Sequence, residues 1–75
     1  MPVDWEAYAR GIEADIAELK KAIAPLEAGE MTIGERKAGG PWRDVTQESI
    51  ARNKRAITTY ETILKDVRTN RIKGA

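Results

Sequence analysis

Residues 5 to 26, WEAYARGIEADIAELKKAIAPL, carry apolar residues at alternating steps of four and three. That spacing puts the apolar side chains on one stripe of an α-helix. Asp4 is a good N-cap, and Gly29 suits the left-handed turn that ends a helix. We therefore predict a helix over residues 4 to 28, kinked at Pro25. Its stripe consists of Trp5, Ala9, Ile12, Ile16, Leu19, Ile23 and Leu26.

A second stripe follows a glycine-rich interruption. Thr46 has the side chain of an N-cap, and the pattern predicts a helix over residues 46 to 70, followed by a frayed basic end over 71 to 75. Asn53 falls where an apolar residue is expected; it either fixes the register or lies solvated at the edge, and we favour the second reading. The stripe consists of Ile50, Ala56, Ile57, Tyr60, Ile63, Leu64 and Val67.

The net charge of +1 hides an uneven distribution. Residues 1 to 30 carry seven acidic against three basic side chains, a net charge of −4, whereas residues 46 to 75 carry the reverse, +4. Oppositely charged helices that flank an apolar seam favour pairing with each other. We interpret the asymmetry as complementarity within one antiparallel helical hairpin.

The connecting segment, residues 29 to 45, is longer than the usual link between helices. Residues 31 to 33 alternate in polarity, residues 37 to 41 supply turn formers, and residues 42 to 45 can return as a strand. The sequence predicts a small β-hairpin or ordered loop here. We expect Met31, Ile33 and Trp42 to close the end of the core.

The composition disfavours catalysis. The chain has neither cysteine nor histidine, which removes the commonest nucleophile partner and the usual metal ligands. The glycines of residues 34 to 40 lack the phosphate-loop pattern. We expect no enzyme activity, cofactor or metal. With no membrane span and no signal-like start, we expect a cytoplasmic protein.

A single 75-residue domain of this kind leaves part of each broad stripe facing water, notably at Tyr8, Ala56 and Ile63. The hypothesis is a mainly α protein that dimerises into a four-helix bundle and serves as a protein-interaction or structural module, with another protein as the alternative partner. The expected core and interface residues are Trp5, Tyr8, Ile12, Ile16, Leu19, Ile23, Leu26, Ile50, Ile57, Tyr60, Ile63, Leu64 and Val67.

A nucleic-acid-associated protein is the alternative, because the second helix and the loop are basic and Trp42 could stack on a base. An isoelectric point near 8.0 and the acidic first helix weigh against it. The contacts would come from Arg36, Lys37, Arg43, Arg52 and Arg55.

Overall fold

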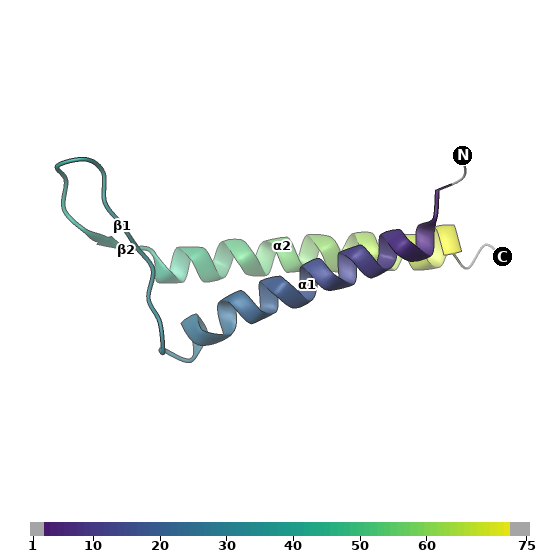
Figure 1. Cartoon of the computed structure of the whole chain (residues 1–75), viewed down its shortest axis with the longest axis horizontal. Helices are drawn as coiled ribbons and strands as arrows, with labels where there is room; N and C mark the ends of the chain where they lie inside the picture. Colours follow the sequence, from purple (N-terminus) through teal and green to yellow (C-terminus); the bar gives the residue numbers. More distant parts are fainter. Residues whose placement is uncertain (1–2, 73–75) are drawn as a thin grey trace.

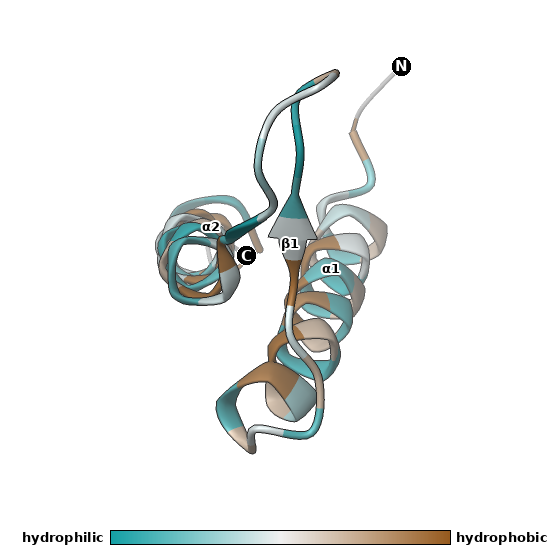
Figure 2. Cartoon of the chain, turned by 90° about the vertical axis from the view of Figure 1, so that its left-hand side faces the viewer, coloured by the Kyte–Doolittle hydropathy of each residue, from teal (hydrophilic) through white to brown (hydrophobic). Residues whose placement is uncertain are grey.

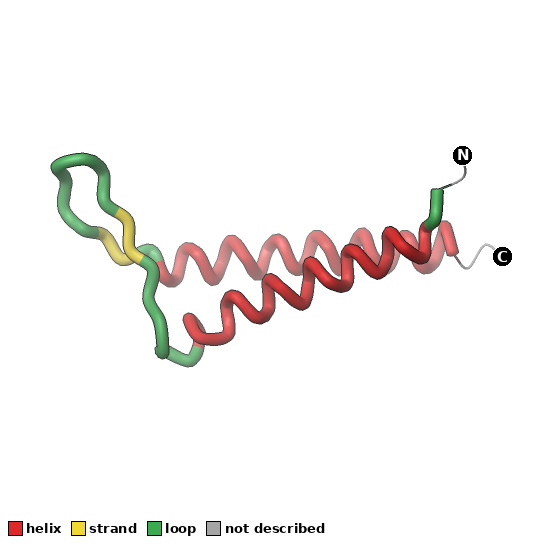
Figure 3. The backbone as a smooth tube through the Cα atoms, viewed as in Figure 1, coloured by secondary structure: helices red, strands yellow, loops and turns green. Residues whose placement is uncertain are grey.

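A computed structural model describes residues 3–72 of the chain as a helical hairpin. Helix α1 (Trp5–Glu27) and helix α2 (Thr46–Val67) run antiparallel, and α2 continues into a π-helical turn, η1 (Arg68–Ile72) (Figure 1). Strands β1 (Gly34–Glu35) and β2 (Arg43–Asp44) form a two-stranded antiparallel sheet in the segment that connects the helices, at one end of the helix pair (Figure 3). The predicted mainly helical hairpin with a small β-hairpin is confirmed.

Helix α1 begins where the sequence predicts. The Asp4 carboxylate accepts a hydrogen bond of 3.0 Å from the backbone N–H of Ala7, which satisfies one of the unpaired donors at the helix start. Glu6 in the first turn adds a negative charge near the positive end of the helix dipole. The side chain of Asp4 therefore fixes the first turn of α1.

The end of α1 is a glycine-terminated cap. Gly29 has a φ of 77°, and its N–H donates to the carbonyl of Leu26 at 3.3 Å. The N–H of Glu30 donates to the carbonyl of Pro25 at 2.9 Å, which completes a Schellman motif. The helix runs through Pro25 to Glu27, and Leu26 stays buried in the stripe.

The start of α2 differs from the prediction that Thr46 caps it. Val45 occupies the N-cap position without a side-chain bond, and Thr46 is the first helical residue. The Asp44 carboxylate accepts from both the backbone N–H of Thr46, at 2.9 Å, and its hydroxyl, at 2.6 Å. The hydroxyl also accepts from the N–H of Ile33 at 2.9 Å. Thr46, only 7% exposed, therefore ties the β-hairpin to the helix.

The core lies along the single contact between the helices. Ile12, Ile16, Ile23 and Ile57 form a buried cluster. Their burial confirms the predicted stripes and places the core at the α1–α2 contact. Partly buried Leu19, Tyr60 and Leu64 pack against the cluster, and Ala9, Leu26, Val45, Ile50 and Val67 are also buried.

The edges of the stripes are more open. Trp5 and Asn53 are partly buried, in keeping with Asn53 at the edge of the contact. Tyr8 is 43% and Ile63 36% exposed, as expected for residues that a second helix alone does not cover. The helical hairpin therefore retains an apolar surface beside its core.

The prediction that three hairpin residues close the core is wrong for the single chain. Met31 is 56%, Ile33 36% and Trp42 70% exposed. The strands are only two residues long, the tip of the β-hairpin turns away from both helices (Figure 2), and these three side chains remain exposed. These residues form an exposed apolar end instead.

The C-terminal part of α2 extends two residues beyond the predicted helix as η1. The Arg71 guanidinium lies over the Trp5 ring, 5.2 Å from its centroid, and the Trp5 and Tyr8 ring centroids are 5.5 Å apart. A cation over an indole ring is attracted to it, so this contact joins the two chain ends. The predicted fraying of residues 73–75 lies outside the described residues.

Candidate interaction surface

One side of the helix contact is lined by three ion pairs between α1 and α2 with its continuation η1. Both helices contribute these residues at seven-residue intervals, forward along α1 and backward along α2. The pairs are Glu13 with Arg68 at 2.6 Å, Lys20 with Glu61 at 3.8 Å, and Glu27 with Lys54 at 2.7 Å. We call these six residues the ladder flank.

The ladder flank favours one alignment of α1 and α2 along their lengths. Its charges alternate along α1 as negative, positive, negative, so a slip of one heptad would bring like charges together. The six side chains are between 44% and 60% exposed, so each pair contributes only about 0–1 kcal/mol. Their effect is to select one alignment of α1 and α2, and they confirm the predicted charge complementarity within the hairpin.

The opposite side of the contact has a different composition. Residues five positions before each ladder residue lie about 140° away around the helix, across the apolar stripe. These residues form what we call the open flank: Tyr8, Asp15 and Ala22 from α1, and Ser49, Ala56 and Ile63 from α2.

The open flank is largely uncharged and exposed. Tyr8, Ala22 and Ile63 are exposed, and Ala56 is partly buried. Among residues 3–72, no ion pair joins α1 to α2 on this flank. A largely uncharged exposed strip of this kind is typical of a surface that another molecule covers.

The β-hairpin presents a second exposed feature, Trp42. A Cβ atom added to Gly34 would lie 2.2 Å from atoms of the Trp42 indole, so the ring packs directly against the glycine backbone. Gly34 pairs with Asp44 of β2, and Trp42 directly precedes that strand. Only a glycine leaves room for this contact. One face of the indole is held in place while the rest of the side chain is exposed.

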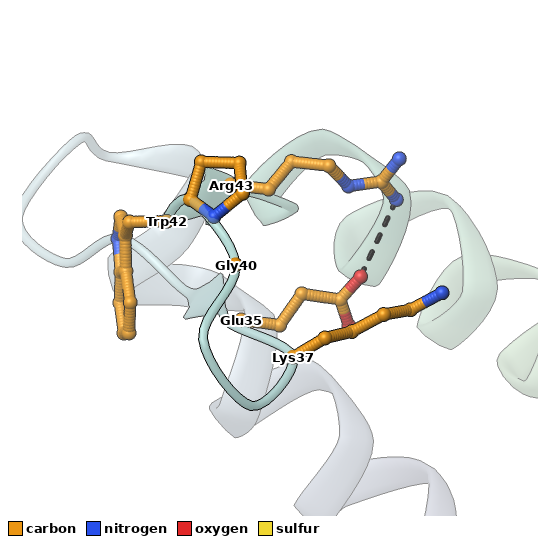
Figure 4. A pocket seen from close by; sticks show the side chains of 6 residues that line it. Glu35, Lys37, Gly40, Trp42 and Arg43 are labelled. Atoms are coloured by element: carbon orange, nitrogen blue, oxygen red, sulfur yellow. Dashed lines mark ion pairs between the residues drawn. The ribbon is translucent and has the colours of Figure 1, made fainter.

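Arg43 of the β-hairpin pairs with two carboxylates, one from the β-hairpin and one from α2. Arg43 contacts Glu35 at 3.5 Å and Glu48 at 2.8 Å. Trp42 projects away from the Arg43–Glu35 pair (Figure 4). A shallow hollow of about 440 Å³ lies between these groups. It is lined by Glu35, Lys37, Gly40, Pro41, Trp42 and Arg43.

The five residues considered for nucleic-acid contact come from two elements. Arg36 and Lys37 are exposed near the hairpin turn, and Arg52 and Arg55 are exposed on α2. Arg43 is engaged by two carboxylates, which reduces its availability for a phosphate group. Their placement therefore gives weaker support to nucleic-acid binding than the sequence did.

No role was predicted for Asp44 from the sequence. Hydrogen bonds from the Thr46 hydroxyl, and then from the Thr46 backbone N–H, lower the pKa of the Asp44 carboxyl below its usual value. An Asp two residues before a Thr is the spacing of a turn closed by the Asp side chain, and this was the available signal. Asp44 holds the junction of β2 and α2.

Three further findings concern metal binding, membrane spanning and similarity to known proteins. No cluster of His, Cys, Asp or Glu among residues 3–72 could hold a metal ion. In the same residues, no helix is long and apolar enough to cross a bilayer. Comparisons with protein-family models, curated proteins and solved structures found no match to this chain.

Proposed function

We propose that the protein is a non-enzymatic interaction module that acts as a homodimer of helical hairpins, closed into a four-helix bundle. The observation that carries the proposal is the exposed area. The chain exposes 5903 Å², whereas a compact monomer of 8.3 kDa exposes about 4,600 Å². The excess, roughly 1,300 Å², exceeds the roughly 800 Å² that each partner buries in a standard interface.

The shape of the chain explains this excess. Its dimensions are 56 × 27 × 15 Å and its radius of gyration is 17.0 Å, against about 11 Å for a compact domain of this length. Two helices in contact share one seam, and among the described residues no large side chain is fully buried. A second hairpin would cover the exposed side of that seam.

The side-chain chemistry supports an interaction role over catalysis. The chain has no histidine or cysteine to act as a base or a thiolate nucleophile. The shallow hollow at the β-hairpin is lined by paired charges and an indole, without a nucleophile beside a base. The pairing of Arg43 favours protein interaction over the nucleic-acid alternative.

Light scattering after size-exclusion chromatography tests the proposal, with the loading concentration varied over three decades. We expect a molar mass of twice the 8.3 kDa chain that falls toward the chain mass only on dilution, since dimerisation depends on protomer concentration. A mass equal to that of one chain at every concentration, including millimolar samples, would contradict it.

A further inference from the structure

We infer that the two copies pack through their open flanks with both β-hairpins at the same end of the bundle, so that α1 of each copy lies against α2 of the other. This inference rests on the proposed homodimer and adds its interface and its orientation. It commits the open flank to a second copy of this chain.

The size of the open side fits such an interface. A helix of 22 residues is about 33 Å long, and two adjacent helices of about 10 Å diameter span about 20 Å. The footprint is therefore about 650 Å² per copy, close to the roughly 800 Å² of a standard interface. The ladder flank is the poorer choice, because burying it would desolvate six charged groups.

Only two twofold arrangements bring the open flanks of two antiparallel hairpins face to face. If the symmetry axis runs along the helices, α1 lies over the partner's α2 and the β-hairpins share one end. If the axis crosses the helices, α1 lies over the partner's α1 and the β-hairpins lie at opposite ends. The two arrangements bury the same flank, so electrostatics decides between them.

The charges favour the first arrangement. Asp15 and Glu18 lie near the middle of α1, on and beside the open flank. An α1–α1 contact would bring these carboxylates against their own copies, where like charges repel. An α1–α2 contact instead joins α1, with a net charge of −2, to α2 and its continuation η1, with a net charge of +3. On α2, Arg52 lies beside the open flank. The Asp66 carboxylate of α2 already accepts a hydrogen bond from the Asn70 side chain.

The orientation has a consequence for function. Each chain exposes Met31, Ile33 and Trp42 at its β-hairpin end. When both hairpins lie at one end of the bundle, the two exposed apolar groups form one continuous, two-copy surface. The opposite arrangement would separate them by the length of the molecule, 56 Å for a single chain.

Distance measurement between nitroxide labels tests the orientation. The chain has no native cysteine, so single labels are placed by Ala38→Cys at the exposed hairpin turn and, separately, by Ala7→Cys at the opposite end of the hairpin. Double electron–electron resonance on each labelled dimer should give a distance well below 56 Å for both positions. Light scattering on the same labelled samples reports whether they are dimers.

The outcomes separate the two proposals. A distance well below 56 Å between the Ala38 labels supports the shared end. A dimer whose Ala38 labels lie 56 Å or more apart, with the Ala7 labels separated by about the length of a helix, would overturn the orientation and leave the homodimer intact. Samples with the mass of one chain and no dipolar coupling between labels would overturn the proposed function itself.

Discussion

The ladder flank and the open flank border the same apolar stripe, yet they are built for different contacts. The ladder flank carries six charged side chains in three pairs, and the open flank carries Asp15 as its single charge. Exposed ion pairs keep their hydration and fix register, whereas a partner covers uncharged surface at a lower desolvation cost. One flank therefore aligns the chain with itself, and the other is the surface on which we propose that a second copy packs.

The largest expected effect comes from removing the core beneath both flanks. Ile57→Ala empties part of the buried cluster and should lower the free energy of unfolding by about 2–5 kcal/mol. Chemical denaturation followed by circular dichroism, at a concentration below dimerisation, measures this change.

Ile63→Ala is the matched control, because it deletes the same atoms from the open flank, where Ile63 is 36% exposed. In the monomer it should cost clearly less than Ile57→Ala, since a partly hydrated side chain leaves no closed cavity. Equal losses for the two variants would show that the open flank is not open in solution.

A smaller effect is expected from the ladder flank. Glu61→Lys places a lysine opposite Lys20 and should lower the unfolding free energy by up to about 1 kcal/mol, given the exposure of the pair. The double variant Lys20→Glu with Glu61→Lys should recover most of the loss. Thermal unfolding at low salt measures both, and light scattering should show an unchanged dimer. If the Glu61→Lys dimer dissociated, the interface would lie on the ladder flank and not on the open flank.

The hairpin end should respond to acid independently of both flanks. The pKa of Asp44 is lowered in the folded chain, so its contribution to stability is present at neutral pH and is lost as pH falls below the ordinary aspartate value of 3.8. Asp44→Asn should therefore be less stable than the parent chain at pH 7. The difference between them should shrink as pH falls through and below 3.8. Unfolding curves at pH 7, 4 and 2 check this, and a difference that stays constant with pH would refute it.

Much of the fold follows from the sequence because periodicity and end signals are local. The four-and-three spacing located both stripes, and Asp4 and Gly29 marked the ends of α1. The net charges of the two halves indicated that they pair. Which individual charges pair was not predicted, because that depends on the relative alignment of two helices separated by a 17-residue connection.

The β-hairpin was harder to predict, because its structure also depends on how two segments align. Short strands have no periodicity of their own, so the side that Trp42 faces depends on the register with Gly34. A large indole beside apolar residues suggested a core position, whereas the glycine backbone is what it contacts. Thr46 was predicted to be a cap because its hydroxyl suits that role, but the hydroxyl instead donates to the Asp44 carboxylate and accepts from the Ile33 N–H.

The most direct test of the two-flank account compares Ala22→Lys with Ala14→Lys. Both alanines are exposed on α1, but Ala22 lies on the open flank and Ala14 faces away from the helix contact. A lysine in the interface is buried without a partner, so Ala22→Lys should weaken dimerisation at least about tenfold, equivalent to 1.4 kcal/mol. Ala14→Lys should leave it unchanged. Light scattering over a dilution series measures both. If the two variants dimerise equally well, the open flank is not the interface and the account fails.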